Sequence, residues 1–284
     1  MPRDVTGVLE NIGPVVEFRF EGDGTLGDAA RRIGKDLERI VVGGGDGTLN
    51  LALPAVLEAG VPLGVIPLGT ANDFVRSLDL PEDPVEAAEL IRHGYTQRVD
   101  AGKANDRPFL NAVGIGLGAE LNSALDSETK QRLGVFAYLR SFAEVLHRRS
   151  RKGAIISLDG QRKKTRFLQI TIANGVHYGG GMTIARQARL DDGELKVLCL
   201  YPQTVWKLLG HAVTLRRGPE PGRKESYGIK LYSAQEVKVF TRESHDVTAD
   251  GELITQTPLT CESMPLALEV YVQPAGKPGA MGND

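Results

Sequence analysis

The chain has 284 residues, of which 41% are hydrophobic and 25% charged, as in an ordinary folded protein. Its formal net charge of −2 excludes a global attraction to nucleic acid or membranes, so any such binding would have to come from local patches. No run approaches the roughly 20 apolar residues of a membrane-spanning helix, and the N-terminus lacks the apolar stretch of a signal peptide. We expect a soluble, cytoplasmic protein with no nucleic-acid partner and with buried free thiols at Cys199 and Cys261.

The first third of the chain alternates strand-like and helical patterns. Strand-like runs occur at VVEFRF (15–20), RIVVG (39–43) and PLGVIPLG (62–69). Helical patterns occur at 26–39, 48–60, 71–78 and 84–94. Pro54 lies inside the second helical pattern, where we expect a short first segment or a kink. The alternation predicts a parallel sheet covered by helices, in an α/β domain over residues 1–96.

The remainder of the chain reads mainly as strands. Asn105-Asp106 and Asp159-Gly160 mark hairpin turns between strand-like runs. Two helical segments, at 134–149 and 202–217, interrupt the strands. We therefore expect a β-rich, antiparallel sandwich over residues 97–284, with a frayed tail at its end.

The run VVGGGDGTLN places small residues where a strand turns sharply toward a helix. Glycines let backbone N–H groups approach an anion closely, and the helix N-terminus adds partial positive charge. Asp46 suits such a turn if it orders the loop or approaches phosphates through Mg²⁺. An ordinary βα turn capped by Asp46 or Thr48 explains the same residues equally well.

A second turn of the same kind, PLGTANDF, follows the next strand. Thr70 and Asn72 carry neutral hydrogen-bonding groups, and Asp73 adds a carboxylate. Ligands of open parallel sheets bind at the carboxyl ends of the strands, so both turns would face one crevice. Helix capping explains either turn alone but not the pair. The sequence is neither a Walker P-loop nor a dinucleotide fingerprint, because Gly-Lys-Ser/Thr and G-x-G-x-x-G are absent there.

Five ordered motifs resemble a known family: GGDGTLN, PLGTANDF, YGGGM, LDDGELKV and ADGE. They are similar to the bacterial lipid kinases of the diacylglycerol kinase catalytic-domain superfamily, with sphingosine, ceramide and NAD kinases as more distant relatives. The resemblance runs in register from about Val15 to Pro274. It implies an NAD-kinase-like α/β nucleotide-binding domain followed by a β-rich domain for lipid substrate and metal.

The resemblance also implies roles for individual residues. It implies ATP and Mg²⁺ as cofactors, a lipid alcohol such as diacylglycerol as substrate, and Glu252 of ADGE as the general base. Asp46 is counted with Glu252 as catalytic, and Asp192, with Asp191 beside it, as ligands of a structural Mg²⁺. The implied nucleotide-binding residues are Gly44, Gly45, Asp46, Gly47, Thr48, Leu49, Asn50, Thr70, Asn72, Asp73 and Asp100. For the Asp191 and Asp250 turns, an ordinary Asp-Gly turn is the alternative.

The sequence departs from the family at its start. Family members open with a strand and an Asn-Pro-x-x-Gly loop that touches the phosphates, and this sequence begins after that element. We therefore expect either a shortened reading of a longer product or a nucleotide site that lacks one wall. An NAD kinase-like enzyme and a non-catalytic nucleotide- or lipid-binding regulator are the alternatives. The oligomeric state cannot be read from the sequence.

Basic clusters stand at 147–152, 161–166 and 216–224. Solvated surface is the ordinary explanation of such clusters. If they share a face, they would attract the protein to an anionic membrane surface by about 1 kcal/mol for each charge. Peripheral contact with the inner face of the membrane is therefore a further hypothesis.

Overall fold

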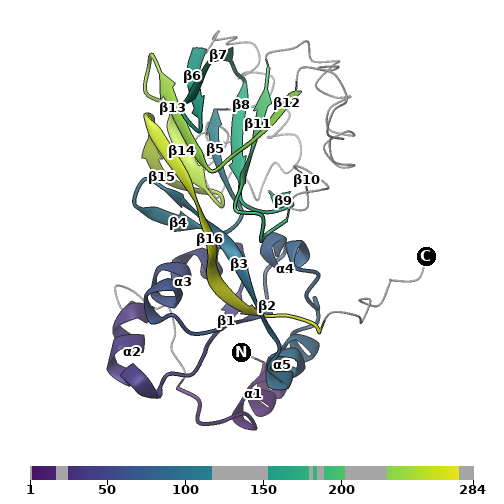
Figure 1. Ribbon diagram of the computed structural model, residues 1–284. Coiled ribbons are helices and arrows are strands. Elements are labelled where there is room, and N and C mark those ends of the chain that lie inside the picture. The colour runs from purple at the N-terminus through teal and green to yellow at the C-terminus, as the bar shows by residue number, and fades with distance from the viewer. Residues whose placement is uncertain are drawn as a thin grey trace, which may run out of the picture.

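The computed structural model describes residues 2–16, 25–116, 153–178, 182–183, 189–201 and 229–274. These residues form two lobes, one with helices around a small sheet and one made of strands (Figure 1). The predicted α/β domain followed by a β-rich sandwich is confirmed. The helical segments predicted at 134–149 and 202–217 and the frayed tail lie outside the described residues.

The α/β lobe contains a parallel strand pair and the helices that pack against it. Its elements are α1 (Arg3–Glu10), α2 (Leu26–Ile33), the 3₁₀ turn η1 (Gly34–Asp36), β1 (Ile40–Gly44), α3 (Asp46–Ala59), β2 (Leu63–Pro67), α4 (Asp73–Ser77) and α5 (Pro84–His93). Strands β1 and β2 are parallel, with Ile40 opposite Leu63 and Gly44 opposite Pro67. Their carboxyl ends therefore lie level, and the two glycine-containing turns begin at the same edge.

Two elements of this lobe, α1 and α2, differ from the expectation. Helix α1 has no counterpart in the sequence-based interpretation, although Val5 and Leu9 pack their apolar side chains into a cluster with α5. Helix α2 ends eight residues after its start because Gly34 takes a left-handed φ of 63°, which favours glycine. The strand expected at 15–20 falls mostly outside the described residues, and Val15 and Val16 are not in a strand.

Helix α3 continues through Pro54 without a break, so the expected short first segment is wrong. Pro54 cannot donate the usual hydrogen bond four residues back. Burial compensates for this loss, because the flanking Leu53 and Ala55 are both buried in the lobe. The helix therefore keeps its N-terminus at Asp46, directly after β1.

The second lobe is an antiparallel sandwich. Its strands are β3 (Thr96–Ala104), β4 (Arg107–Phe109), β5 (Ala112–Gly116), β6 (Gly153–Leu158), β7 (Gln161–Arg166), β8 (Gln169–Ala173), β9 (His177–Tyr178), β10 (Met182–Thr183), β11 (Leu195–Leu200), β12 (Ile229–Ala234), β13 (Glu236–Thr241), β14 (Asp246–Ala249), β15 (Glu252–Gln256) and β16 (Leu259–Tyr271). One sheet runs β12-β11-β8-β5-β14-β15, and the other contains β13, β6 and β7 beside β16. The predicted turns at Asn105-Asp106 and Asp159-Gly160 connect β3 to β4 and β6 to β7.

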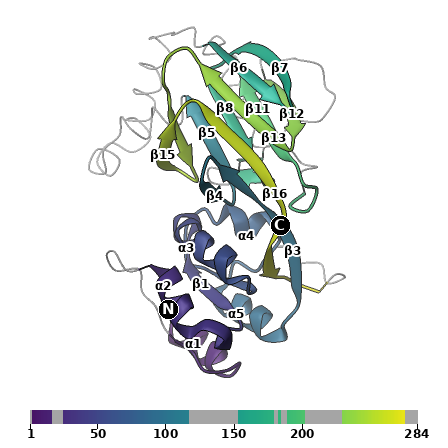
Figure 2. The ribbon, with the colours of Figure 1, turned by 60° about the vertical axis from the view of Figure 1, so that its left-hand side comes forward.

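Strand β16 belongs to both lobes. Its first residues pair with β13 in the sandwich, and Val270 near its end pairs with Leu63 of β2 in the α/β lobe. Strand β3 runs antiparallel beside it, so the two strands bridge the lobes (Figure 2). The division at residues 96 and 97 stays a prediction, since the end of β16 returns to the first sheet. The shared strands fix the ADGE turn relative to the glycine turns.

Candidate functional site

The two glycine-containing turns are in direct backbone contact. The N–H of Leu68 donates to the carbonyl oxygen of Gly44 at 3.0 Å. A Cβ atom placed on Gly69 would lie 2.5 Å from the Cα atom of Gly45, which is closer than real Cβ atoms approach. Glycine is therefore required where the turns cross, and the expectation that both line one edge of the sheet holds for the backbone.

Asp46 joins the first turn to the second. Its carboxylate accepts hydrogen bonds from the N–H groups of Asp73 at 3.1 Å and Phe74 at 3.2 Å, at the start of α4. The side-chain amide of Asn111 donates to the same carboxylate at 2.9 Å. With three donors on its oxygens, Asp46 orders the loops, which is one of the two roles considered for it.

Asn111 connects this network to the sandwich and was missed by the sequence-based interpretation. It follows β4, and its backbone N–H donates to the carboxylate of Asp250 at 3.2 Å while its side chain reaches Asp46. A lone polar residue inside the apolar run RPFLNAVGIG was the available signal. The contact spans 65 positions in sequence, so no local pattern could reveal its partner.

Asp250 is the second carboxylate of the junction. Its oxygens accept from the N–H groups of Leu110, Asn111 and Ala112, the shortest of these bonds being 2.8 Å. Burial raises the pKa of Asp250 to about 7, with the nearby Asp46 charge adding to the rise and the backbone donors opposing it. The ADGE turn is therefore a hairpin between β14 and β15 whose aspartate holds the junction together.

Glu252 follows two residues later and faces the first glycine turn. A Cβ atom placed on Gly47 would have Oε1 of Glu252 as its neighbour at 3.8 Å. The side chain of Glu252 is exposed. The structure thus brings Glu252 from the sandwich against the N-terminus of α3 in the α/β lobe.

The N-terminus of α3 fits a phosphate group. Its N-cap residue, Gly45, provides no side-chain hydrogen bond, so no side chain of the cap occupies the first N–H groups of this helix. Oδ1 of Asn50 and Oδ1 of Asn72 are buried, and neither has a hydrogen-bond partner in the structure. Buried polar atoms normally have partners, so these two oxygens are candidates for contacts with a bound group.

The other predicted nucleotide-binding residues differ in exposure and in packing. Thr70 is exposed at the second turn, whereas Asp73 is buried there. Leu49 packs into the core of the α/β lobe and presents only its backbone to the turn. Thr48 lies so close to Gly44 that a Cβ atom there would meet the Thr48 Cβ at 2.4 Å, which explains the glycine.

Asp100 has contacts different from those of Asp46. Only 1% exposed on β3, it accepts from the N–H of Gly193 at 2.7 Å and from the N–H of Leu266 at 2.8 Å. These donors belong to the LDDG turn and to an irregular part of β16. Asp100 therefore ties the metal-motif turn to the strands that bridge the lobes, and its role toward nucleotide stays a prediction.

The comparisons with known proteins agree with this geometry. The diacylglycerol kinase catalytic domain matches residues 2–104, and the YegS C-terminal NAD kinase beta sandwich-like domain matches residues 111–272. A diacylglycerol kinase of Staphylococcus carnosus is 32% identical over 88% of this chain and 81% of its own length.

The chain belongs to the diacylglycerol kinase-like lipid kinases.

A YegS-like lipid kinase of Pseudomonas putida is 31% identical over 97% of this chain and 91% of its own. The crystal structure of a diacylglycerol kinase from Bacillus anthracis str. Sterne superposes with a TM-score of 0.74 at 26% identity, covering 96% of this chain and 91% of that one. The protein is a lipid kinase, and among its described helices none is long and apolar enough to cross a membrane.

The LDDG turn of this lipid kinase holds side-chain cations where Mg²⁺ ligands were expected. Oδ2 of Asp192 lies 2.9 Å from Nζ of Lys196, which also contacts Glu194 at 2.8 Å. Asp191 pairs with Arg189 at 2.7 Å. Burial lowers the pKa of Lys196, but the hydrogen bonds that its ammonium group donates to Glu194 and Asp192 outweigh burial and raise the pKa overall. The ammonium group of Lys196 thus contacts the carboxylate of Asp192, which was expected to bind the metal.

Among the described residues, no group of three or more His, Cys, Asp or Glu side chains is placed to hold a metal ion. The two carboxylates of the LDDG turn are instead paired with cations of the chain itself, Asp191 with Arg189 and Asp192 with Lys196. That role of Asp191 and Asp192 stays a prediction, and no step of the reaction is derived from it.

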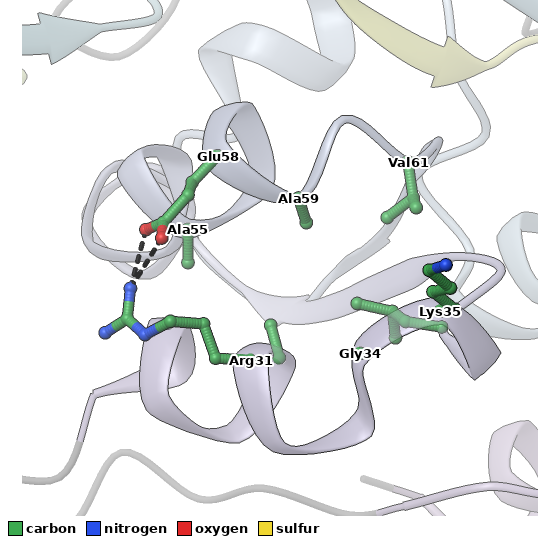
Figure 3. A pocket seen from close by; sticks show the side chains of 10 residues that line it. Arg31, Gly34, Lys35, Ala55, Glu58, Ala59 and Val61 are labelled. Carbon is green, nitrogen blue, oxygen red and sulfur yellow. Dashed lines mark hydrogen bonds and ion pairs between the residues drawn. The ribbon is translucent and has the colours of Figure 1, made fainter.

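A hollow of about 400 Å³ between α2 and α3 contains none of the predicted site residues (Figure 3). Arg31 and Glu58 form an ion pair at this hollow with a distance of 2.7 Å. Glu58 is near the far end of α3, about 18 Å along the helix from Asp46 at 1.5 Å per residue. The hollow is therefore separate from the junction where the two turns meet Glu252.

Proposed function

We propose that this lipid kinase transfers the γ-phosphoryl group of ATP to the hydroxyl of diacylglycerol or a related lipid alcohol, with Mg²⁺ and with Glu252 as the general base. The observation that carries the proposal is the position of Glu252 against Gly47, at the N-terminus of α3. A base from one lobe then faces a phosphate-binding turn from the other. Phosphoryl transfer requires mainly this kind of positioning together with charge neutralisation.

The α/β lobe would hold the nucleotide. The N–H groups at the start of α3 donate to phosphate oxygens, and their partial positive charge favours the anion. Asp46 and the orphaned oxygen of Asn72 would hold Mg²⁺, directly or through water. When bound, the ion supplies neutralisation of the charge on the phosphates. Asp46 retains room for this contact because an ionised carboxylate offers about four acceptor positions and three are used here.

Glu252 would accept the proton of the lipid hydroxyl while the hydroxyl oxygen forms its bond to the γ-phosphorus. The bond between the γ-phosphorus and the bridging oxygen breaks, and ADP leaves with that oxygen. Exposure of Glu252 leaves its carboxylate accessible to an acceptor entering from solvent or from a membrane surface. The names of the relatives from Staphylococcus carnosus and Bacillus anthracis favour diacylglycerol as the acceptor class.

The test is incubation of the full chain with γ-labelled ATP, Mg²⁺ and separate acceptors: diacylglycerol, phosphatidylglycerol, a sphingoid base and NAD. We expect label in a lipid and none in NAD. Glu252→Gln should lower turnover at least about hundredfold, because general-base catalysis contributes on the order of 10²–10⁴. Asp46→Asn should abolish transfer as well.

The matched control is Glu243→Gln, which removes an exposed carboxylate of the same lobe outside the junction. Its turnover should equal that of the wild type. Label in NAD, or full turnover by Glu252→Gln with every lipid, would overturn the proposal.

A further inference from the structure

A shallow hollow of about 740 Å³ opens at the end of the sandwich farthest from the α/β lobe. Strand β16 begins at Leu259, opposite Val239 of β13, and runs from there to β2, so the residues of β13 beyond Val239 lie at the distal end. We call this surface the distal basic patch. It is lined by Gly153, Ala154, Ile155, Lys164, Thr165, Arg166, Tyr201, Lys230, Phe240, Thr241 and Arg242.

Two apolar side chains lie side by side on the outer face of this patch. Phe240 of β13 is opposite Ile155 of β6, which is opposite Lys164 of β7, so the three occupy one row across the sheet. Phe240 is 40% exposed and Ile155 is 38% exposed. This apolar pair, flanked by a lysine, differs from its neighbours Ile156 and Val239 on the same strands, which are buried in the core.

Positive charge surrounds the apolar pair. Arg166 lies two residues after Lys164 and therefore points to the same side of β7. Arg242 follows β13, and Lys230 of the second sheet lies 5.2 Å over the ring of Tyr201. Among the described residues, four cationic side chains thus line the hollow and no acidic one does, in a chain whose formal net charge is −2.

We propose that the distal basic patch binds the phosphate groups of anionic phospholipids at a membrane surface, with Ile155 and Phe240 entering the interface. Cationic side chains alone would bind any phosphate, but a free phosphate ion makes no favourable contact with two exposed apolar side chains. A basic surface with apolar side chains at its centre is the composition of interfacial membrane contacts.

The patch gives the basic cluster at 161–166 a specific role. Of the basic residues in that cluster, Lys164 and Arg166 line the hollow, whereas Lys163 lies over the ring of Tyr232 at 4.6 Å. The clusters at 147–152 and 216–224 lie outside the described residues. Because the patch is remote from Glu252, the proposal does not depend on which lipid is phosphorylated.

The experiment is sedimentation of the full chain with vesicles of phosphatidylcholine, with and without phosphatidylglycerol, in the absence of ATP. We expect binding to the phosphatidylglycerol vesicles that weakens with salt. The variant Lys164→Gln, Arg166→Gln, Arg242→Gln should lower the partition coefficient about hundredfold, at roughly fivefold for each charge near an anionic surface. Phe240→Ser should weaken binding about tenfold or more through the loss of apolar insertion.

The control removes the same charge from the other lobe with Arg32→Gln, Lys35→Gln, Arg92→Gln, three exposed residues of α2, η1 and α5. It should bind vesicles like the wild type, and thermal unfolding should show that all variants are folded. Wild-type binding by the patch variant, or equal wild-type binding to neutral and anionic vesicles, would overturn the proposal. A wild-type protein that binds inorganic pyrophosphate but does not bind vesicles would overturn the proposal too. So would a wild-type protein that is a dimer and that Phe240→Ser converts to a monomer, with no binding to vesicles.

Discussion

Two Asp-Gly turns of this lipid kinase have opposite electrostatic surroundings. Asp46, before Gly47, accepts hydrogen bonds from two backbone N–H groups and an amide, and Glu252 lies beside the turn. Asp192, before Gly193, instead pairs with the ammonium of Lys196. The described donors to Asp46 are all neutral, so they leave its negative charge without a cation. The negative charge of Asp192 is neutralised by Lys196 of the same chain. The same pair of residues therefore accepts neutral donors in one place and pairs with a cation in the other.

The largest effect should come from the contact between the two nucleotide turns. Gly69→Ala would place a Cβ atom 2.5 Å from the Cα of Gly45 and 2.7 Å from Oδ1 of Asn72. Because backbone atoms would have to move, we expect kinase activity to fall at least about hundredfold, the loss that a misplacement of about 1 Å causes. Lipid phosphorylation by the folded variant measures it. Gly7→Ala is the control: nothing lies within 4 Å of its Cβ position, and in the interior of α1 it should stabilise the fold slightly. Activity of Gly69→Ala equal to that of the control would contradict this account of the turn.

The second prediction concerns pH and the junction carboxylate Asp250. Its pKa is about 7 in the folded state against 3.8 ordinarily, so the folded chain binds a proton that the unfolded chain lacks between these values. The contribution of Asp250 to the free energy of unfolding is therefore present below about pH 4 and is lost as pH rises to about 7. The full loss is on the order of 4 kcal/mol, at about 1.4 kcal/mol for each pKa unit.

Urea unfolding at pH 5 and pH 8 measures this effect, with Asp250→Asn removing it. Asp159→Asn is the matched control, since Asp159 also precedes a turn glycine and accepts from two backbone N–H groups but is exposed. The wild type and Asp159→Asn should lose more stability between pH 5 and pH 8 than Asp250→Asn. Equal losses in all three proteins would show that Asp250 does not titrate in this window.

The third prediction tests whether Lys196 replaces a metal at the second turn. Lys196→Met leaves the carboxylates of Asp192 and Glu194 without their cation, and the lysine side chain is only 10% exposed. We expect a loss of about 2 kcal/mol, below the 3–5 kcal/mol of fully buried pairs because both partners are partly exposed. Mg²⁺ should then raise the Tm of the variant but not that of the wild type.

Lys238→Met supplies the comparison for Lys196. Lys238 pairs with Glu236 at 2.9 Å, also on a strand, but its side chain is 38% exposed, so its loss should cost less than about 1 kcal/mol. A wild-type Tm that falls on chelation of divalent ions would contradict the replacement of a metal by Lys196.

The sequence predicted what depends on neighbours along the chain. The βα turn at Gly44–Asn50 and the helix ended by Gly94 follow from local glycines and apolar periodicity, and both the parallel pair and the sandwich follow from the order of strands and helices. It did not predict the ion pair between Lys196 and Asp192, which requires that β11 bury the side chain of this lysine. Nor did local rules predict α3 running through Pro54, because burial overrides the missing hydrogen bond.

The smallest effect should come from Asn111, the residue that links the two carboxylates of the site. Asn111→Ala removes one of three donors to Asp46, and a hydrogen bond to a charged group is worth about 1.5–3 kcal/mol at most. Since both backbone donors to Asp46 remain, we expect kcat to fall about tenfold with little change in the KM for ATP. Asn111→Asp should be worse than Asn111→Ala, because it brings a third carboxylate against Asp46 and Asp250 and repels both. Steady-state kinetics of the two variants distinguish a positioning role from a space-filling one. Asn111→Asp keeps the volume of the side chain, so wild-type kinetics of Asn111→Asp beside an impaired Asn111→Ala would mean that Asn111 acts by its volume and not as a donor to Asp46.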